Sequence, residues 1–117
     1  MGFKFEKLDV WQKSLDLSHR VHELTKSFPR EELYVLTSQI KRAADSVVLN
    51  ISEGSTGQTN AEFRQFLSYA IRSNVEVVAC LYLAQRRSLI QDAEFKRLYS
   101  ESENIVKMLQ VLRNSIY

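Results

Sequence analysis

Glycine, proline and cysteine are scarce in this chain of 117 residues, which has three glycines, one proline and one cysteine. Glycine and proline favour turns and interrupt regular elements, so their scarcity predicts few, long elements with short connections. The single cysteine, Cys80, excludes an intrachain disulfide and favours a reducing compartment. The sequence also lacks the roughly 20 consecutive apolar residues of a membrane span, and its first residues lack the apolar core of a signal peptide. We therefore expect a single cytoplasmic domain, residues 1–117, without a membrane partner.

A large charge excess is missing as well, because 16 Lys and Arg stand against 14 Asp and Glu for a net charge of +2. A protein that mainly binds phosphates usually carries a larger cationic excess, since each neutralised phosphate takes its own Lys or Arg. The charge therefore permits nucleic-acid binding but does not by itself predict it.

Apolar residues recur at helical spacing in four stretches, at about 10–28, 31–53, 60–87 and 92–116. No stretch alternates for long enough with the period of two that marks a half-buried strand. Four helices with short connections place sequence neighbours antiparallel. The sequence therefore predicts an all-α protein, an antiparallel up-down four-helix bundle.

Local signals mark the ends of these helices. Asp9 and Thr59 each precede a Gln or Glu by three residues, which is the capping-box pattern of a helix start. Asp92 is the expected cap of the fourth helix. Pro29 interrupts the chain between the first two helices, and Gly54 is expected to end the second, as C-terminal glycines commonly do.

The third predicted helix is more apolar than one buried stripe requires. Residues 77–84 form an unbroken apolar and aromatic run longer than two turns, so apolar groups point in every direction. One interpretation is a helix set unusually deep in the bundle. The other, which we favour, is a contact between subunits of a homo-oligomer, because exposed apolar surface needs cover. The predicted interface residues are Val77, Val78, Leu81, Tyr82 and Leu83.

A narrow polar stripe lies beside the apolar face of the second helix. Its members, spaced three, four, four and three residues apart, share one side of a helix: Gln39, Arg42, Ser46, Asn50 and Glu53. Ser73 and Glu76 have a similar place on the third helix. We expect a structural network that fixes helix register and subunit pairing, with Arg42 paired to Glu76 or Glu53. The alternative is a pocket or pore that binds a polar ligand.

Charged residues of both signs gather at one end of the predicted bundle. The cations there are Lys26, Arg30, Arg86, Arg87, Lys96 and Arg97. The acids there are Glu23, Glu31, Glu32, Asp92 and Glu94. This mixture favours a solvated, ion-paired rim. The alternative is a surface whose six cations contact nucleic-acid phosphates.

Patterns typical of catalysis or metal binding are weak. His19, His22 and Glu23 lie at i, i+3 and i+4, but they lack the fourth ligand of a closed zinc site. Cys80 has apolar neighbours, and burial of that kind raises the pKa of a thiol and makes it inert. The sequence has no nucleophile-elbow or phosphate-loop motif. We expect no enzymatic activity, no metal, no cofactor and no small-molecule substrate.

Several short motifs, taken in order, resemble a known family. The segment from Phe28 to Gly54 carries most of the resemblance, through Phe28-Pro29, Glu32, Tyr34, Leu36, Gln39-Ile40, Arg42-Ala43-Ala44, Ser46, Asn50-Ile51 and Glu53-Gly54. Further matches are Val10-Trp11-Gln12 before it, and Glu62-Phe63, Phe66-Leu67 and Ala70-Ile71-Arg72-Ser73-Asn74-Val75-Glu76 after it. Together they resemble the four-helix-bundle family named for proteins encoded in intervening sequences of bacterial large-subunit ribosomal RNA genes.

The resemblance implies a small cytosolic bacterial protein that assembles as a ring, typically a pentamer. In a related branch, accessory subunits of diversity-generating reverse transcriptases bind nucleic acid and the polymerase on a basic surface. Arg72 departs from the family pattern, which commonly has a glycine there, and the turn at residues 86–90 lacks the glycine often found in it.

We therefore predict a non-enzymatic, homo-oligomeric bundle that associates with RNA or other nucleic acid. The alternative is a protein-only scaffold or accessory subunit, for example of a reverse transcriptase, that does not bind nucleic acid directly.

Overall fold

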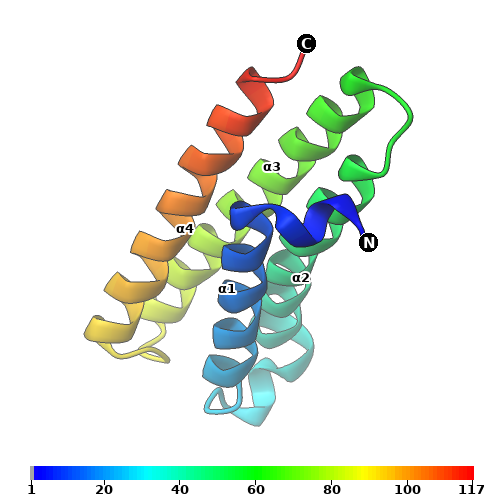
Figure 1. Ribbon diagram of the computed structural model, residues 1–117. Helices are drawn as coiled ribbons and strands as arrows, with labels where there is room; N and C mark the ends of the chain where they lie inside the picture. Colours follow the sequence, from blue (N-terminus) through cyan, green and yellow to red (C-terminus); the bar gives the residue numbers. More distant parts are fainter. Residues whose placement is uncertain (1) are drawn as a thin grey trace.

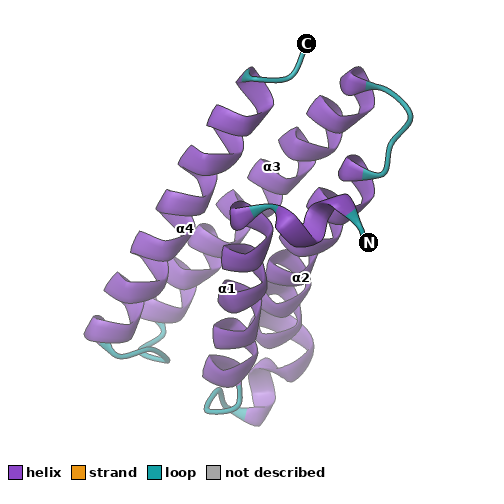
Figure 2. Ribbon diagram, viewed as in Figure 1, coloured by secondary structure: helices purple, strands orange, loops and turns teal. Residues whose placement is uncertain are grey.

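The computed structural model describes residues 2–117 and consists of four long helices in up-and-down order (Figure 1). They are α1 (Asp9–Thr25), α2 (Ser38–Ser55), α3 (Asn60–Arg86) and α4 (Asp92–Asn114). Three short helical turns, η1 (Lys4–Lys7), η2 (Arg30–Glu32) and η3 (Leu33–Thr37), precede α1 and α2. Residues 2–117 contain no strand (Figure 2). The predicted all-α, up-down four-helix bundle is confirmed.

The core lies between all four helices, with α3 packed against both α2 and α4. The apolar stripes read from helical spacing supply it, and the largest fully buried side chains include Leu17, Ile40, Ile51, Leu67, Leu81, Leu98 and Leu109. By length and composition alone α3 would pass for a membrane-spanning helix, a test that the central helix of a bundle can also meet. Eight of its residues are buried in the fold.

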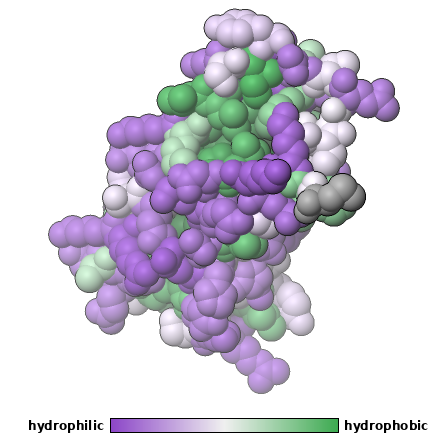
Figure 3. All heavy atoms as spheres, viewed as in Figure 1, coloured by the Kyte–Doolittle hydropathy of each residue, from purple (hydrophilic) through white to green (hydrophobic). Residues whose placement is uncertain are grey.

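The helices differ in length, and this leaves a hollow on one face. α1 has 17 residues and α3 has 27, so α1 begins part of the way down the bundle and η1 crosses above it (Figure 1). Hydrophobic side chains gather there, on a face that is otherwise mostly hydrophilic (Figure 3). The hollow of about 430 Å³ is lined by Leu8, Val10, Met108, Val111 and Leu112 among others.

The second helix does not begin at residue 31 as the sequence predicts. A 3-10 turn and a single π-helical turn, Leu33–Thr37, come first, and the regular helix starts at Ser38. The wider π turn shifts the register, so Leu36 is buried whereas Tyr34 is 89% exposed. Leu33, in the same turn, is also exposed.

Gly54 does not end α2, which continues through Ser55. A Cβ atom at Gly54 would lie 2.6 Å from the Cβ of Phe66 on α3, closer than two non-bonded carbon atoms can approach. The glycine is therefore needed for the close approach of α2 and α3 and not for a left-handed cap, which is the role that the sequence suggested.

The predicted capping signals differ in outcome. Thr59 caps α3, since its Oγ1 accepts a hydrogen bond from the Glu62 backbone N–H at 3.1 Å. Asp9 is the first residue of α1 and not its cap, because Leu8 has the N-cap position and its carbonyl accepts from the Trp11 and Gln12 backbone N–H groups. Asp92 is likewise the first residue of α4.

The turn after α3 places Ser88 at φ 59°, in the left-handed region that favours glycine. This is the turn in which the family pattern often has a glycine. Ser88 therefore carries a backbone strain of about 1 kcal/mol that a glycine would not.

Candidate functional site

All seven residues of the predicted polar network line one open groove between α2 and α3. The groove has a volume of about 680 Å³, and its lining also includes Asp45 and Leu49. The seven are Gln39, Arg42, Ser46, Asn50, Glu53, Ser73 and Glu76. Helical spacing thus located a continuous surface feature that spans two helices.

Hydrogen bonds across this groove join α2 to α3, and each of them has at most one charged partner. Gln39 Nε2 donates to Glu76 Oε2 at 2.9 Å, and the hydroxyls of Ser46 and Ser73 are 2.8 Å apart. Asn50 Nδ2 donates to the backbone carbonyl of Ser46 at 2.8 Å and to its Oγ at 2.9 Å. Ser46 is therefore the centre of the network, since it contacts one residue on each helix.

The predicted ion pair of Arg42 with Glu76 or Glu53 is wrong. Arg42 and Glu53 are eleven residues apart on one helix, which separates them by about 16 Å. Glu76 is occupied by Gln39 instead. Within residues 2–117, neither Arg42 nor Glu53 has an ion-pair partner, and both side chains are exposed.

The predicted interface residues on α3 divide into two sets. Val77 and Leu81 are fully buried within the bundle, so their assignment to a subunit contact is wrong. They face the core because α3 packs between α2 and α4 and presents a wider buried face than a helix at the edge. Val78 is half-buried, whereas Tyr82 and Leu83 are 52% and 46% exposed and remain available to a partner.

Exposed apolar side chains concentrate on α2, α3 and the turn that leads into α2. Twelve large hydrophobic residues are exposed within residues 2–117, and eight of them belong to these elements. The eight are Leu33, Tyr34, Val35, Leu49, Tyr69, Val75, Tyr82 and Leu83. We call the outer surface of these elements, with its groove, the α2–α3 side.

Most cations of the predicted basic end are neutralised within the chain. Lys26 pairs with Glu23 at 3.0 Å, and the same hydrogen bond holds the pKa of Glu23 below its ordinary value. Three further pairs are Arg87–Glu32 at 2.9 Å, Lys96–Asp92 at 3.1 Å and Arg97–Glu101 at 3.4 Å. Arg30 and Arg86 have no such partner within residues 2–117. The geometry favours the ion-paired rim over a phosphate-binding surface at this end.

Cys80 lies in the core, where its side chain is almost fully buried. Burial, together with the nearby Glu76 carboxylate and opposed by Arg87, raises the pKa of its thiol to about 11. A thiol with such a pKa is uncharged at neutral pH and a poor nucleophile.

The histidines are not brought into a metal-binding cluster. His22 Nε2 lies 3.0 Å from Asp45 Oδ1, and Ser18 Oγ donates to the same oxygen at 2.6 Å. Within residues 2–117 no three His, Cys, Asp or Glu side chains are close enough together to hold a metal ion. Asp45 therefore links α1 to α2.

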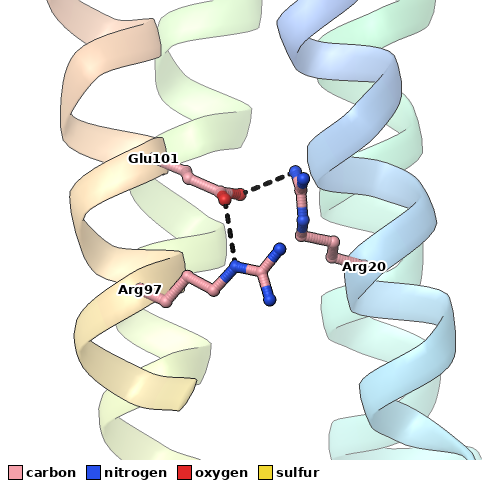
Figure 4. A network of polar contacts seen from close by, with 3 residues as sticks. All are labelled: Arg20, Arg97 and Glu101. Atoms are coloured by element: carbon pink, nitrogen blue, oxygen red, sulfur yellow. Dashed lines mark hydrogen bonds and ion pairs between the residues drawn. The ribbon is translucent and has the colours of Figure 1, made fainter. Parts of the chain in front are cut away.

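Two contacts between distant parts of the chain were not foreseen from the sequence. Glu101 on α4 accepts from Arg20 on α1 at 3.1 Å and from Arg97 on its own helix at 3.4 Å (Figure 4). In the core, Asn74 Nδ2 donates to the Ser102 carbonyl at 3.2 Å, while Asn74 Oδ1 and Ser102 Oγ have no hydrogen-bond partner among the described residues 2–117. Only Arg97–Glu101, at i and i+4, has a local signal in the sequence.

Comparison with known proteins places the chain in a family. A model of the 23S rRNA-intervening sequence protein family matches residues 6–111. The fold is similar to the crystal structure of a protein of unknown function from the S23 ribosomal protein family of Bacteroides thetaiotaomicron. The two chains have 28% sequence identity and a TM-score of 0.84 over 90% of this chain and 95% of the other. A comparison with curated proteins finds no match. From the match over most of its length, the chain belongs to the 23S rRNA-intervening sequence protein family.

Proposed function

We propose that this protein is a non-enzymatic scaffold that assembles with copies of itself through the α2–α3 side. The observation that carries the proposal is the concentration of exposed apolar side chains there, including Leu49 at 59% exposure beside the groove. Exposed apolar side chains beside polar groups are typical of protein–protein interfaces.

The groove supports self-association in a second way. Arg42 and Glu53 are exposed, opposite in charge and without ion-pair partners within residues 2–117. A surface that carries both an unpaired cation and an unpaired anion can be neutralised by another copy of the same chain. The family resemblance favours a closed ring, with five subunits as the expected number.

The arrangement of polar side chains favours a scaffold over an enzyme. In a hydrolytic triad the histidine contacts the nucleophile, and the carboxylate orients the histidine. Here Ser18 and His22 both contact the Asp45 carboxylate, so the histidine is not positioned to take the serine proton.

Light scattering coupled to gel filtration tests the proposal directly. We expect a mass several times the 13.6 kDa of one chain, and five times that mass for the expected ring. A mass of one chain at micromolar concentration would overturn the proposal.

Association with RNA at the basic end remains the second candidate function, supported by the family resemblance and by Arg30 and Arg86, which have no ion-pair partner among residues 2–117. Gel-shift titration of structured RNA over a salt series separates it from a protein-only scaffold. Binding through phosphates weakens steeply as salt increases. The absence of a shift even at low salt would leave the protein-only scaffold.

A further inference from the structure

The arginines of this bundle differ in what holds them. Arg20, Arg87 and Arg97 are neutralised by carboxylates. Within residues 2–117, two arginines are instead held only by uncharged acceptors. Arg64 Nη1 donates to the Ile116 carbonyl at 3.0 Å, and Arg113 Nη1 donates to Ser68 Oγ at 3.3 Å. Hydrogen bonds therefore position both guanidinium groups, but no Asp or Glu side chain within residues 2–117 pairs with their charge.

These two arginines line the same cleft, where the beginning of α3 lies beside the end of α4 (Figure 1). The cleft has a volume of about 850 Å³, and none of the residues that line it is Asp or Glu. Its other polar side chains, Gln65, Ser68, Asn114 and Tyr117, can donate hydrogen bonds. The α2–α3 groove contrasts with it, since its lining includes three carboxylates, Asp45, Glu53 and Glu76.

The chemistry of the cleft suits an anion with several oxygens. A guanidinium has five N–H donors, and Arg64 and Arg113 each use one N–H of Nη1 on a neutral neighbour. The remaining donors present a planar fork that matches two oxygens of a phosphate. Because neighbouring groups already hold both side chains, less conformational entropy is lost when an anion binds.

We propose that this cleft binds phosphate groups, with Arg64 and Arg113 as the two ligating cations. The shared chemistry fits either consecutive phosphates of an RNA backbone or the phosphates of a small molecule. The site lies at the opposite end of α3 from Arg86 and Arg87, where the sequence predicts nucleic-acid contacts. It lies outside the α2–α3 groove, because neither arginine lines that groove.

The test uses the full chain and the double variant Arg64→Gln with Arg113→Gln, which removes both charges and retains side-chain length. The matched control is Lys13→Gln with Arg72→Gln, which removes two exposed cations that lie outside both the cleft and the basic end and have no ion-pair partner within residues 2–117. Fluorescence anisotropy measures binding of a labelled single-stranded RNA, and calorimetry measures binding of inorganic pyrophosphate. Circular dichroism and light scattering check that each variant keeps the fold and mass of the parent chain.

We expect the cleft variant to weaken RNA binding by at least about tenfold. We also expect it to lower the slope of log K against log salt by about 1.4, the value for two phosphate contacts on a single strand. The control variant should retain most of the binding. Pyrophosphate binding that the cleft variant abolishes, without RNA binding, would support the cleft and identify a small molecule as the source of the phosphate. The proposal is overturned if neither probe binds at low salt, or if the cleft variant binds both as well as the parent chain does.

Discussion

The two sides of this bundle are held together by different chemistry. On the side formed by α1 and α4, ion pairs dominate, and the Glu101 carboxylate joins Arg20 to Arg97 across the two helices. On the α2–α3 side, hydroxyl and amide hydrogen bonds join α2 to α3, and within residues 2–117 the ion pair on this side, Arg87–Glu32, joins the end of α3 to the turn before α2. Exposed large apolar residues follow the opposite trend, since α1 and α4 carry only Leu15 and Val111.

This difference indicates which side of the bundle gains more from contact with another subunit. Charges that neutralise each other on a solvated surface leave little to gain from further contacts. Apolar side chains and unpaired charges on the α2–α3 side gain from burial and from opposite charges on another chain. The hollow beside α1 is the exception on the charged side, and it makes Val111, 71% exposed, a useful control.

The largest expected effect is loss of assembly when the α2–α3 side receives a charge. Leu49→Asp should reduce the mass measured by light scattering to that of one chain, because it would bury an unpaired carboxylate in the subunit contact. Its fold should persist, since Leu49 is exposed within one chain. Val111→Asp, which charges the other side, should leave the mass unchanged. If Val111→Asp dissociates the protein and Leu49→Asp does not, the hollow is the interface.

A second substitution tests how closely α2 and α3 approach. Gly54→Ala places a Cβ 2.6 Å from the Cβ of Phe66, and the backbones must move apart. We expect a loss of about 1–3 kcal/mol in the free energy of unfolding, measured by urea denaturation at fixed protein concentration. Gly57→Ala, where the nearest atom is a carbonyl oxygen at 3.1 Å, should cost less. Equal losses would show that the close approach at Gly54 is not what matters.

Removing the centre of the hydrogen-bond network should have a moderate effect that does not depend on salt. Ser46→Ala leaves Ser73 and Asn50 without their shared partner. A partly solvated hydrogen bond of this kind contributes about 1 kcal/mol, and neutral groups are not screened by ions. Urea unfolding at low and high salt measures both quantities, and a strongly salt-dependent loss would contradict the neutral network.

A substitution in the turn between α3 and α4 should stabilise the protein. Ser88→Gly should increase the free energy of unfolding by roughly 0.5–1 kcal/mol, because glycine adopts the positive φ of this position without strain. Thermal unfolding monitored by circular dichroism measures the gain. A decrease would mean that the serine side chain makes a contact worth more than the strain.

The smallest effect is expected on the charged side. Glu101→Gln removes the negative charge from both arginine contacts, but the carboxylate is partly exposed, and surface pairs contribute only about 0.5 kcal/mol. The loss should shrink as salt is added, in contrast to the Ser46 variant. A loss larger than that of Ser46→Ala would reverse the comparison of the two sides.

The sequence by itself determined the four helices, their order and the polar groove. These follow from periodicity and local caps, as at Thr59, because which residues share one face of a helix depends only on spacing along the chain. Spacing alone identifies the seven groove residues. It does not identify the partner of Arg42, because helical spacing shows which side of a helix a residue faces and not which residue it contacts.

Tertiary structure alone decided how deeply each apolar residue is buried and which charges meet. Val77 and Leu81 face the core while Leu83 faces outward, although all three belong to one apolar run. Arg20 meets Glu101 across 81 positions of sequence, and Gly54 permits the approach of Phe66 from the next helix. Such contacts depend on how four amphipathic surfaces close around one core, and a pattern within a single helix does not contain that information.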